Sequence, residues 1–106
     1  MKIRKAEMKD IENVKDITYR TIKAVYLHYY PIGAVEFFLK HHREDNIIRD
    51  IKDGAVFLAE EKDTVVGTVT INENEINRLF VLPDFQGKGF GRGLMEFAEK
   101  RIAEKY

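Results

Sequence analysis

The first part of the chain changes from an alternating pattern to helical spacing. Lys2–Ala6 alternates weakly between polar and apolar residues, which predicts a short first strand. From Asp10 onward the spacing is helical, and this helix is expected to reach about Tyr29. Its apolar stripe consists of Ile11, Val14, Ile17, Ile22 and Val25. Such a stripe must pack against another part of the protein.

Pro31 and Gly33 interrupt this pattern, because both disfavour the interior of a helix. Two short helical stretches are expected after them, hinged near His42–Asp45, and Asp53-Gly54 closes the helical region. The apolar positions that predict these stretches are Val35, Phe38, Leu39, Ile47, Ile48 and Ile51.

The pattern then changes from helix to strand. Ala55–Glu60 is a compact apolar run, and Thr64–Ile71 is rich in β-branched residues. Glu61-Lys62-Asp63 between them predicts a hairpin turn. A third strand is predicted over Ile76–Leu82, and it stops at Pro83 because proline has no N–H to donate to a ladder.

A glycine-rich segment leads into a last amphipathic helix from Gly89 onward. One face of that helix carries Phe90, Leu94, Phe97, Ala98 and Ile102. The predicted order is strand, helices, a meander of three strands, and helix. We therefore expect an α/β protein with a mixed sheet (α+β), folded as a single domain over residues 1–106.

Composition narrows the classes of function. Eighteen basic and eighteen acidic residues leave a net charge of +0, so no long-range field attracts nucleic acid or anionic lipid. We expect neither a nucleic-acid partner nor a membrane partner, and no segment is long and apolar enough to span a bilayer. The lack of cysteine removes thiolate sites and fits a reducing compartment, so a cytoplasmic location is expected.

The segment Gln86–Gly93 carries the clearest candidate chemistry. It lies between a predicted strand and a predicted helix, where backbone N–H groups and the positive end of the helix dipole face the same point. Glycine lets an anion approach those amides and permits positive φ angles. The pattern predicts an anion-binding loop.

Two familiar anion-binding motifs fail on spacing. A dinucleotide fingerprint needs G-x-G-x-x-G, but the last position is Arg92 when counting from Gly87 and Leu94 when counting from Gly89. A Walker P-loop needs Ser or Thr after Gly-Lys, and Gly89 follows Lys88 instead.

The pattern that fits is Gln-x-x-Gly-x-Gly, and with it the chain resembles the GNAT acetyltransferases. The resemblance includes the strand Glu75–Leu82 with Pro83 after it, and the helix that contains Leu94–Ala98. It also extends over the whole chain, since the family order is β-α-α-β-β-β-α up to this point. The resemblance implies an acyl-CoA N-acyltransferase fold, with acetyl-CoA as cosubstrate and no metal.

The resemblance also implies which residues bind the cofactor. In the family, amides of this loop hold the coenzyme A pyrophosphate, which corresponds here to Gln86, Gly87, Lys88, Gly89, Phe90, Gly91 and Arg92. The pantetheine arm pairs with the preceding strand through main-chain contacts, at Leu79, Phe80 and Val81. The side chains of Leu79 and Val81 are expected in the core.

Acetyl transfer needs a neutral amine, whereas a lysine-like amine with a pKa of about 10 is mostly protonated at pH 7. Glu75 matches the general base of the histone-acetylating branch of the family and would accept that proton directly or through a water. A solvated turn glutamate beside Glu73 and Asn74 is an equally weighted alternative. The resemblance places the oxyanion at a strand N–H near Phe80. Attack would be direct, because no cysteine is present to form an acyl-enzyme.

Two further groups have structural and functional interpretations. Tyr26–Pro31 corresponds to the connection that borders the acceptor site in the family, but an aromatic patch capping the core is the favoured interpretation. His41-His42 with Glu44 and Asp45 does not predict a metal site, because adjacent helical histidines point in different directions and no i, i+4 partner is present.

The chain stops at Tyr106, whereas GNAT domains usually continue with further strands and a helix. That part often supplies the tyrosine that protonates the coenzyme A thiolate, and no residue here takes this role. The Glu75–Leu82 strand would then form an open sheet edge. We expect either a fragment of a longer enzyme or a homo-oligomer formed through this edge. A non-catalytic coenzyme A-binding or assembly module is the alternative function, and the acceptor amine, a small molecule or a protein, is left open.

Overall fold

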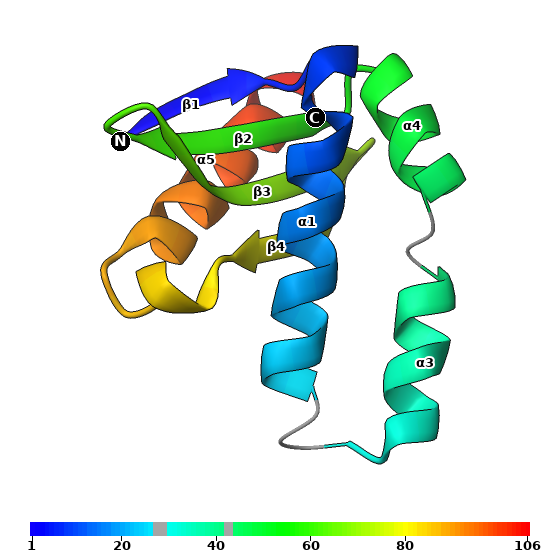
Figure 1. Cartoon of the computed structure of the whole chain (residues 1–106). Coiled ribbons are helices and arrows are strands. Elements are labelled where there is room, and N and C mark those ends of the chain that lie inside the picture. The colour runs from blue at the N-terminus through cyan, green and yellow to red at the C-terminus, as the bar shows by residue number, and fades with distance from the viewer. Residues whose placement is uncertain (27–29, 42–43) are drawn as a thin grey trace.

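A computed structural model describes residues 1–26, 30–41 and 44–106 (Figure 1). The strands are β1 (Lys2–Lys5), β2 (Val56–Glu61), β3 (Thr64–Asn72) and β4 (Glu75–Val81). The α-helices are α1 (Ile11–Thr21), α3 (Ile32–His41), α4 (Glu44–Lys52) and α5 (Phe90–Lys105). Shorter turns are η1 (Met8–Asp10), the π-helical η2 (Ile22–Tyr26) and η3 (Pro83–Phe85).

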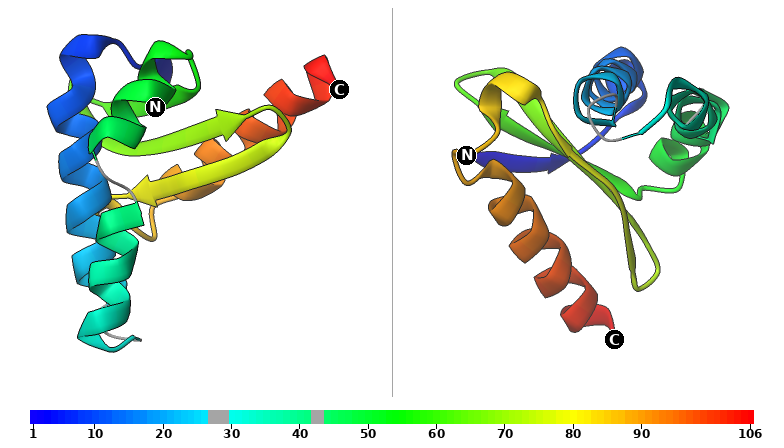
Figure 2. Two further views of the ribbon diagram at one scale, coloured as in Figure 1. Left: turned by 90° about the vertical axis from the view of Figure 1, so that its right-hand side faces the viewer. Right: turned by 90° about the horizontal axis from the view of Figure 1, so that it is seen from below.

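The four strands form one antiparallel sheet in the order β1-β2-β3-β4. Helices α1 and α4 cover one face of this sheet, and α5 covers the other (Figure 2, right). Helix α3 is on the same side as α1 but extends beyond the sheet (Figure 1). The predicted α/β class is therefore confirmed, as is the sequence of strand, helices, three-strand meander and helix, with the α-helices α1, α3 and α4 between β1 and β2. The described strands all pair antiparallel, so the sheet is not mixed as expected. Strand β4 is an edge strand, as expected.

Apolar residues fill both faces of the sheet. The α5 face contains Phe57, Ala59, Val66, Val69 and Val81 packed against Leu94 and Ala98 of α5. The opposite face is covered by α1 and α4, with Val14, Ile47 and Ile51 against Val56 and Leu58, and with Ile17 and Ile22 against Phe80 and Leu82. Strands that are apolar on both faces explain the continuous apolar runs of the sequence.

The hairpin between β2 and β3 turns through Lys62 and Asp63, whose φ angles are 50° and 65°. Glu61 pairs with Thr64 on either side, so two residues form the loop. Positive φ at both central positions matches the right-handed twist of the strands that they join. The predicted turn is confirmed.

Helix α1 is shorter than predicted. It ends at Thr21 and continues as a π-helical turn to Tyr26, while residues 27–29 lie outside the described part of the chain. Pro31 directly precedes α3, where its fixed φ and missing N–H suit the start of a helix. The predicted hinge includes residues 42–43, which also lie outside the described part of the chain. The same holds for the side chains of Val25, Tyr26, Val35, Phe38, Leu39 and His41.

A β-bulge interrupts β4. Thr68 pairs with Phe80 and Thr70 with Asn77, so Arg78 and Leu79 together oppose the single residue Val69. The bulge changes the phase of side-chain alternation. Before it Ile76 faces α5, and after it Leu79 and Val81 face α5 while Phe80 and Leu82 face α1.

Candidate functional site

The glycine loop opens directly onto the amino terminus of α5. Gly87 and Gly89 have φ angles of 77° and 89°, a region that side chains rarely adopt. A methyl group on either residue would meet no other atom within 4 Å. The positive φ angles are as the sequence analysis expected, and the space above both glycines is open.

Backbone donors gather at this end of α5. Its first helical bond runs from the Gly93 N–H to the Gly89 carbonyl, at 3.0 Å. The N–H groups of Phe90, Gly91 and Arg92 precede that bond, so the helix offers them no acceptor. The dipole of this 16-residue helix adds partial positive charge at the same point. The arrangement can hold an anion.

Aromatic packing fixes the shape of the loop. The rings of Phe85 and Phe90 meet edge to face, with centroids 6.1 Å apart, and Lys88 Nζ lies 5.6 Å from the centre of the Phe85 ring. The Arg92 side chain is 85% exposed. The loop therefore has two exposed cations at its rim and an aromatic base beneath it.

Gln86 ties the loop to β4. Its side-chain amide donates to the Val81 carbonyl at 2.9 Å, and the Thr21 hydroxyl of α1 donates to the same oxygen at 3.4 Å. The Gln86 side chain thus links the loop to the end of β4, and its predicted contact with the cofactor stays a prediction.

The main chain of β4 alternates between β3 and the open edge. The Leu82 N–H donates to the Val66 carbonyl at 2.9 Å, and Phe80 pairs with Thr68. The N–H and carbonyl of Val81 between them consequently face away from β3. The Val81 side chain is buried and Leu79 is half-buried against the core, as the sequence predicted.

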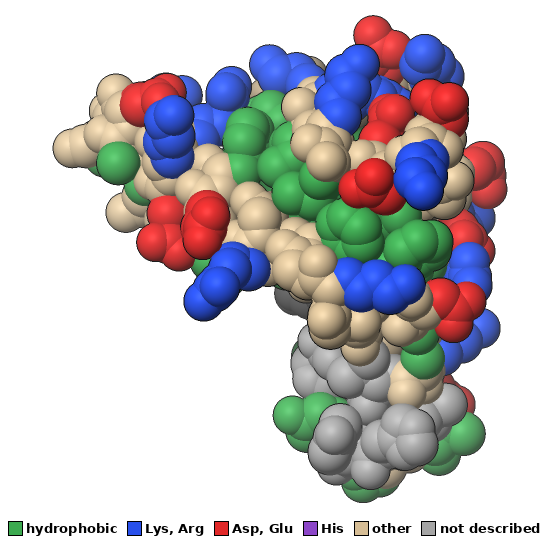
Figure 3. Space-filling model, turned by 90° about the vertical axis from the view of Figure 1, so that its left-hand side faces the viewer, with side chains coloured by type: hydrophobic (Ala, Val, Ile, Leu, Met, Phe, Trp, Pro, Cys, Tyr) green, Lys and Arg blue, Asp and Glu red, His purple; other side chains and the backbone are tan. Residues whose placement is uncertain are grey.

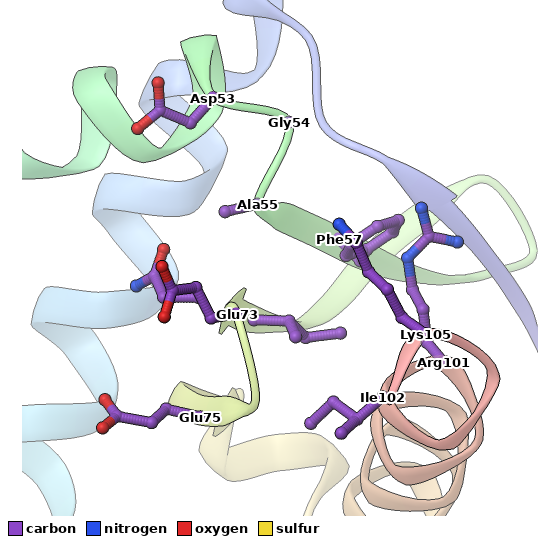
Figure 4. A pocket seen from close by; sticks show the side chains of 11 residues that line it. Asp53, Gly54, Ala55, Phe57, Glu73, Glu75, Arg101, Ile102 and Lys105 are labelled. Carbon is purple, nitrogen blue, oxygen red and sulfur yellow. The ribbon is translucent and has the colours of Figure 1, made fainter.

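Glu75 lies at the opposite end of β4 from the glycine loop, and it is exposed. It lines an open cavity of about 480 Å³. Glu73 and Glu75 lie on one side of this cavity, with Arg101 and Lys105 on the other side (Figure 4). Its apolar lining comes from Ala55, Phe57, Ile71 and Ile102. Both interpretations of Glu75, as a proton acceptor and as a solvated turn residue, fit this position.

Arg78 was not among the site residues predicted from the sequence. Its side chain is 6% exposed and pairs with Asp50 of α4, which is equally buried. Burial lowers the pKa of the Arg78 guanidinium. The available signal was a charged residue within a predicted strand, directly before the apolar run Leu79–Leu82. Buried arginine is rare unless it is paired.

The segment predicted to border the acceptor falls mostly outside the described residues. Tyr30 is 49% exposed, and Ile32 and Phe37 of α3 are 69% and 65% exposed. Figure 3 shows hydrophobic side chains on the surface of the lower lobe, where the ends of α1 and α3 lie in Figure 1. Of the aromatic side chains in the predicted patch Tyr26–Pro31, only that of Tyr30 lies within the described part of the chain, so its interpretation as a cap on the core stays a prediction.

The described ranges 1–26, 30–41 and 44–106 hold no group of three or more acidic or histidine side chains arranged for a metal ion. His42 itself lies outside them, as does the His41 side chain. No helix in this part of the chain has the length and hydropathy needed to cross a bilayer.

The fold and the glycine loop define an acetyltransferase domain. The chain belongs to the GNAT family, because the sequence model of the Acetyltransferase (GNAT) domain matches residues 15–106. A comparison with curated protein sequences gave no match.

Solved structures share the fold at low sequence identity. The PaiA N-acetyltransferase of Thermoplasma acidophilum, solved in complex with coenzyme A, is 22% identical with a TM-score of 0.81, over 98% of this chain and 72% of that one. A GCN5-related N-acetyltransferase of Rhodopseudomonas palustris is 19% identical with a TM-score of 0.89, over 98% and 66%. YjaB of Escherichia coli, solved in its apo form, is 23% identical with a TM-score of 0.72, over 96% and 66%. The chain thus spans about two thirds to three quarters of their lengths.

Proposed function

We propose that this chain binds acetyl-CoA at Gln86–Arg92 and along β4, and that it transfers the acetyl group to an amine, of a small molecule or of a protein. The observation that carries the proposal is the pair of left-handed glycines, Gly87 and Gly89, which open the start of α5 beside the edge of β4. Family membership supports the same ligand. The cytoplasm is the proposed location.

The loop suits the pyrophosphate of coenzyme A. The N–H groups of Phe90, Gly91 and Arg92 converge with the helix dipole, and no side chain of Gly87 or Gly89 stands in the way. Lys88 and Arg92 bring positive charge to the rim. The loop therefore supplies binding and orientation.

The edge of β4 suits the pantetheine arm, which would run away from the loop toward the bulge. Val81 faces this edge, whereas the Phe80 N–H is directed to β3 by the pairing with Thr68. The donors near Phe80 for the thioester oxygen are consequently the neighbouring amides of Leu79 and Val81. This assignment sharpens the expectation of an oxyanion donor near Phe80.

In the proposed reaction the amine nitrogen attacks the thioester carbonyl carbon, and the carbon–sulfur bond breaks to give an amide and a thiolate. The amine proton passes to Glu75. Glu75 lies three positions before Arg78 along the strand, a rise of roughly 10 Å. A chain of water molecules would therefore carry the proton to Glu75, and the thiolate would take a proton from solvent.

Isothermal titration with acetyl-CoA tests the binding step. Gly89→Asp places a side chain and a negative charge at the phosphate position, so we expect binding at least roughly tenfold weaker. Gly33→Asp is the matched control. A Cβ atom added at Gly33 would also meet no atom within 4 Å, and Gly33 lies in α3, away from the loop. No binding by the natural chain, or equal binding by both variants, would refute the proposal.

Turnover of acetyl-CoA with a panel of amines tests the chemical step. Release of free thiol that depends on the amine is the expected result, and Glu75→Gln should slow it by about 10²-fold if Glu75 is the base. Binding without turnover across the panel would instead identify a non-catalytic coenzyme A-binding module.

A further inference from the structure

A buried charged residue forms the bulge of β4. Arg78 has a φ of 47°, a conformation that residues other than glycine rarely adopt. Its guanidinium pairs with the Asp50 carboxylate, and each side chain is only 6% exposed. The ion pair is therefore shielded from water on both sides.

Asp50 connects three elements at this point. It belongs to α4, and its backbone carbonyl accepts a hydrogen bond of 2.9 Å from the N–H of Ala55, which leads into β2. Its side chain reaches β4 through Arg78. The ion pair thus holds the bulge against an anchor that is itself fixed by the backbone.

The bulge determines which groups of β4 face the edge. In a regular strand, Ile76 and Leu79 would point to opposite faces of the sheet. The extra residue of the bulge lets both side chains face α5, while Phe80 and Leu82 face α1. Arg78 and Leu79 are outside the β3–β4 register, while Asn77 and Phe80 are inside it. The direction of the Leu79 amide therefore depends on the bulge.

We propose that Arg78 is a positioning residue: its ion pair with Asp50 holds the bulge in the conformation that directs the Leu79 amide to the acyl group. The inference rests on the proposed function and adds a specific residue pair to it. The glycine loop lies beyond the carboxyl end of β4, whereas Arg78 is in the middle of the strand, so loss of the pair affects acyl transfer more than coenzyme A binding.

Removing one partner alone would leave a buried charge without its counterion and strongly destabilise the fold. The test variant is therefore the double substitution Asp50→Leu with Arg78→Met, which removes both charges at similar volume. Arg78→Lys is a second variant that keeps the charge and loses the fork geometry. Arg49→Met is the matched control, because Arg49 Nε lies 3.8 Å from Asp50 Oδ1 but its side chain is 65% exposed.

Three measurements separate positioning from stability: urea unfolding, coenzyme A affinity by titration, and kcat for acetyl transfer. We expect the double variant to stay folded with coenzyme A affinity within about threefold, and kcat to fall by roughly tenfold or more. Arg78→Lys should give an intermediate kcat, and Arg49→Met should match the natural chain. A double variant with unchanged kcat would overturn the inference, as would parallel losses of kcat and affinity.

The amide signals of Leu79 and Phe80 in ¹H–¹⁵N spectra give a readout that does not need activity. They should shift in the double variant and in Arg78→Lys, but not in Arg49→Met. If the natural chain neither binds coenzyme A nor turns over, the proposed function fails on its own. Unchanged Leu79 signals would still overturn the positioning role, and if the double variant does not fold, Arg78→Lys decides the outcome.

Discussion

Three buried threonine hydroxyls differ in whether they have a partner. Thr68 donates to the Phe57 carbonyl at 3.2 Å, and Thr21 donates to the Val81 carbonyl at 3.4 Å. Thr18 is fully buried, and its hydroxyl has no hydrogen-bond partner among the described residues. A buried hydroxyl without a partner loses its hydration and gains nothing in return.

We therefore expect Thr18→Val to stabilise the fold by about 1 kcal/mol, because valine keeps the shape and removes the polar atom. Thr68→Val is the matched control. It removes a hydroxyl that is hydrogen-bonded, so it should lower the free energy of unfolding by about 1 kcal/mol. Urea unfolding of both variants measures the difference. Equal destabilisation by the two substitutions would show that the Thr18 hydroxyl has a partner after all.

Gly67 allows β3, β4 and α5 to approach closely. A Cβ atom at this position would lie 2.9 Å from the Phe80 carbonyl oxygen and 3.0 Å from Leu94 Cδ1. Backbone cannot move aside as a long side chain can, so Gly67→Ala should cost about 1–3 kcal/mol of stability. Gly91→Ala is the control, because its nearest contact is Val81 Cγ2 at an ordinary 3.7 Å. Thermal unfolding in which Gly67→Ala matches Gly91→Ala would contradict this reading.

At the scale of elements, a second arginine–carboxylate pair joins β1 to the start of α1. The Arg4 guanidinium donates to both oxygens of Asp10, at 2.8 and 2.9 Å, and also pairs with Glu60 of β2. The Glu7 N–H donates to Asp10 as well, at 2.8 Å. The hydrogen bonds from Arg4, and then the one from Glu7, hold the pKa of the Asp10 carboxyl below its usual value.

This network makes stability depend on pH at the acid end. A carboxyl with a lowered pKa in the folded state contributes stability above its unfolded pKa of about 3.9, and the contribution is lost as pH falls through the folded pKa. We expect the free energy of unfolding to drop as pH falls below about 4, and to drop less in Asp10→Asn. Asp16→Asn removes an exposed carboxylate of α1 and should keep the natural slope. Identical slopes for both variants in urea titrations would rule out the Asp10 contribution.

Local rules in the sequence predicted most of the elements. The sequence correctly indicated β2, β3, β4 and α5. The signals were prolines and glycines that end elements, runs of β-branched residues, and the glycine loop. The buried ion pair at the Arg78 bulge could not be predicted, because the partner Asp50 lies 28 positions away in the chain. The same reason applies to Gln86: its place in the motif suggested cofactor contact, whereas its hydrogen bond to Val81 exists only once β4 and the loop have packed.

At the scale of the whole molecule, the two ends of β4 carry different functional groups. The glycine loop at one end provides backbone donors, and Glu75 at the other end borders the cavity with Arg101 and Lys105 across from it. The open edge between them is where the acyl arm of the proposed cofactor would lie. β4 is the last strand of the described sheet, so its outer edge is open to other strands as well.

An open edge leads to a prediction about self-association. Backbone groups that face away from β3, such as those of Val81, can pair with the same edge of a second copy. The bulge at Arg78 and the charges of Glu73 and Glu75 weaken that pairing, and the hydrogen bond from Gln86 already occupies the Val81 carbonyl.

We therefore expect weak dimers whose population rises with concentration in sedimentation velocity. Hydrogen exchange of the Val81 amide should slow with concentration in parallel. Gln86→Ala should strengthen the association, because it leaves the Val81 carbonyl with only the 3.4 Å hydrogen bond from Thr21. Saturating acetyl-CoA should compete with it. A monomer at every concentration, with Val81 exchange unchanged, would show that the bulge and charges suffice to protect this edge.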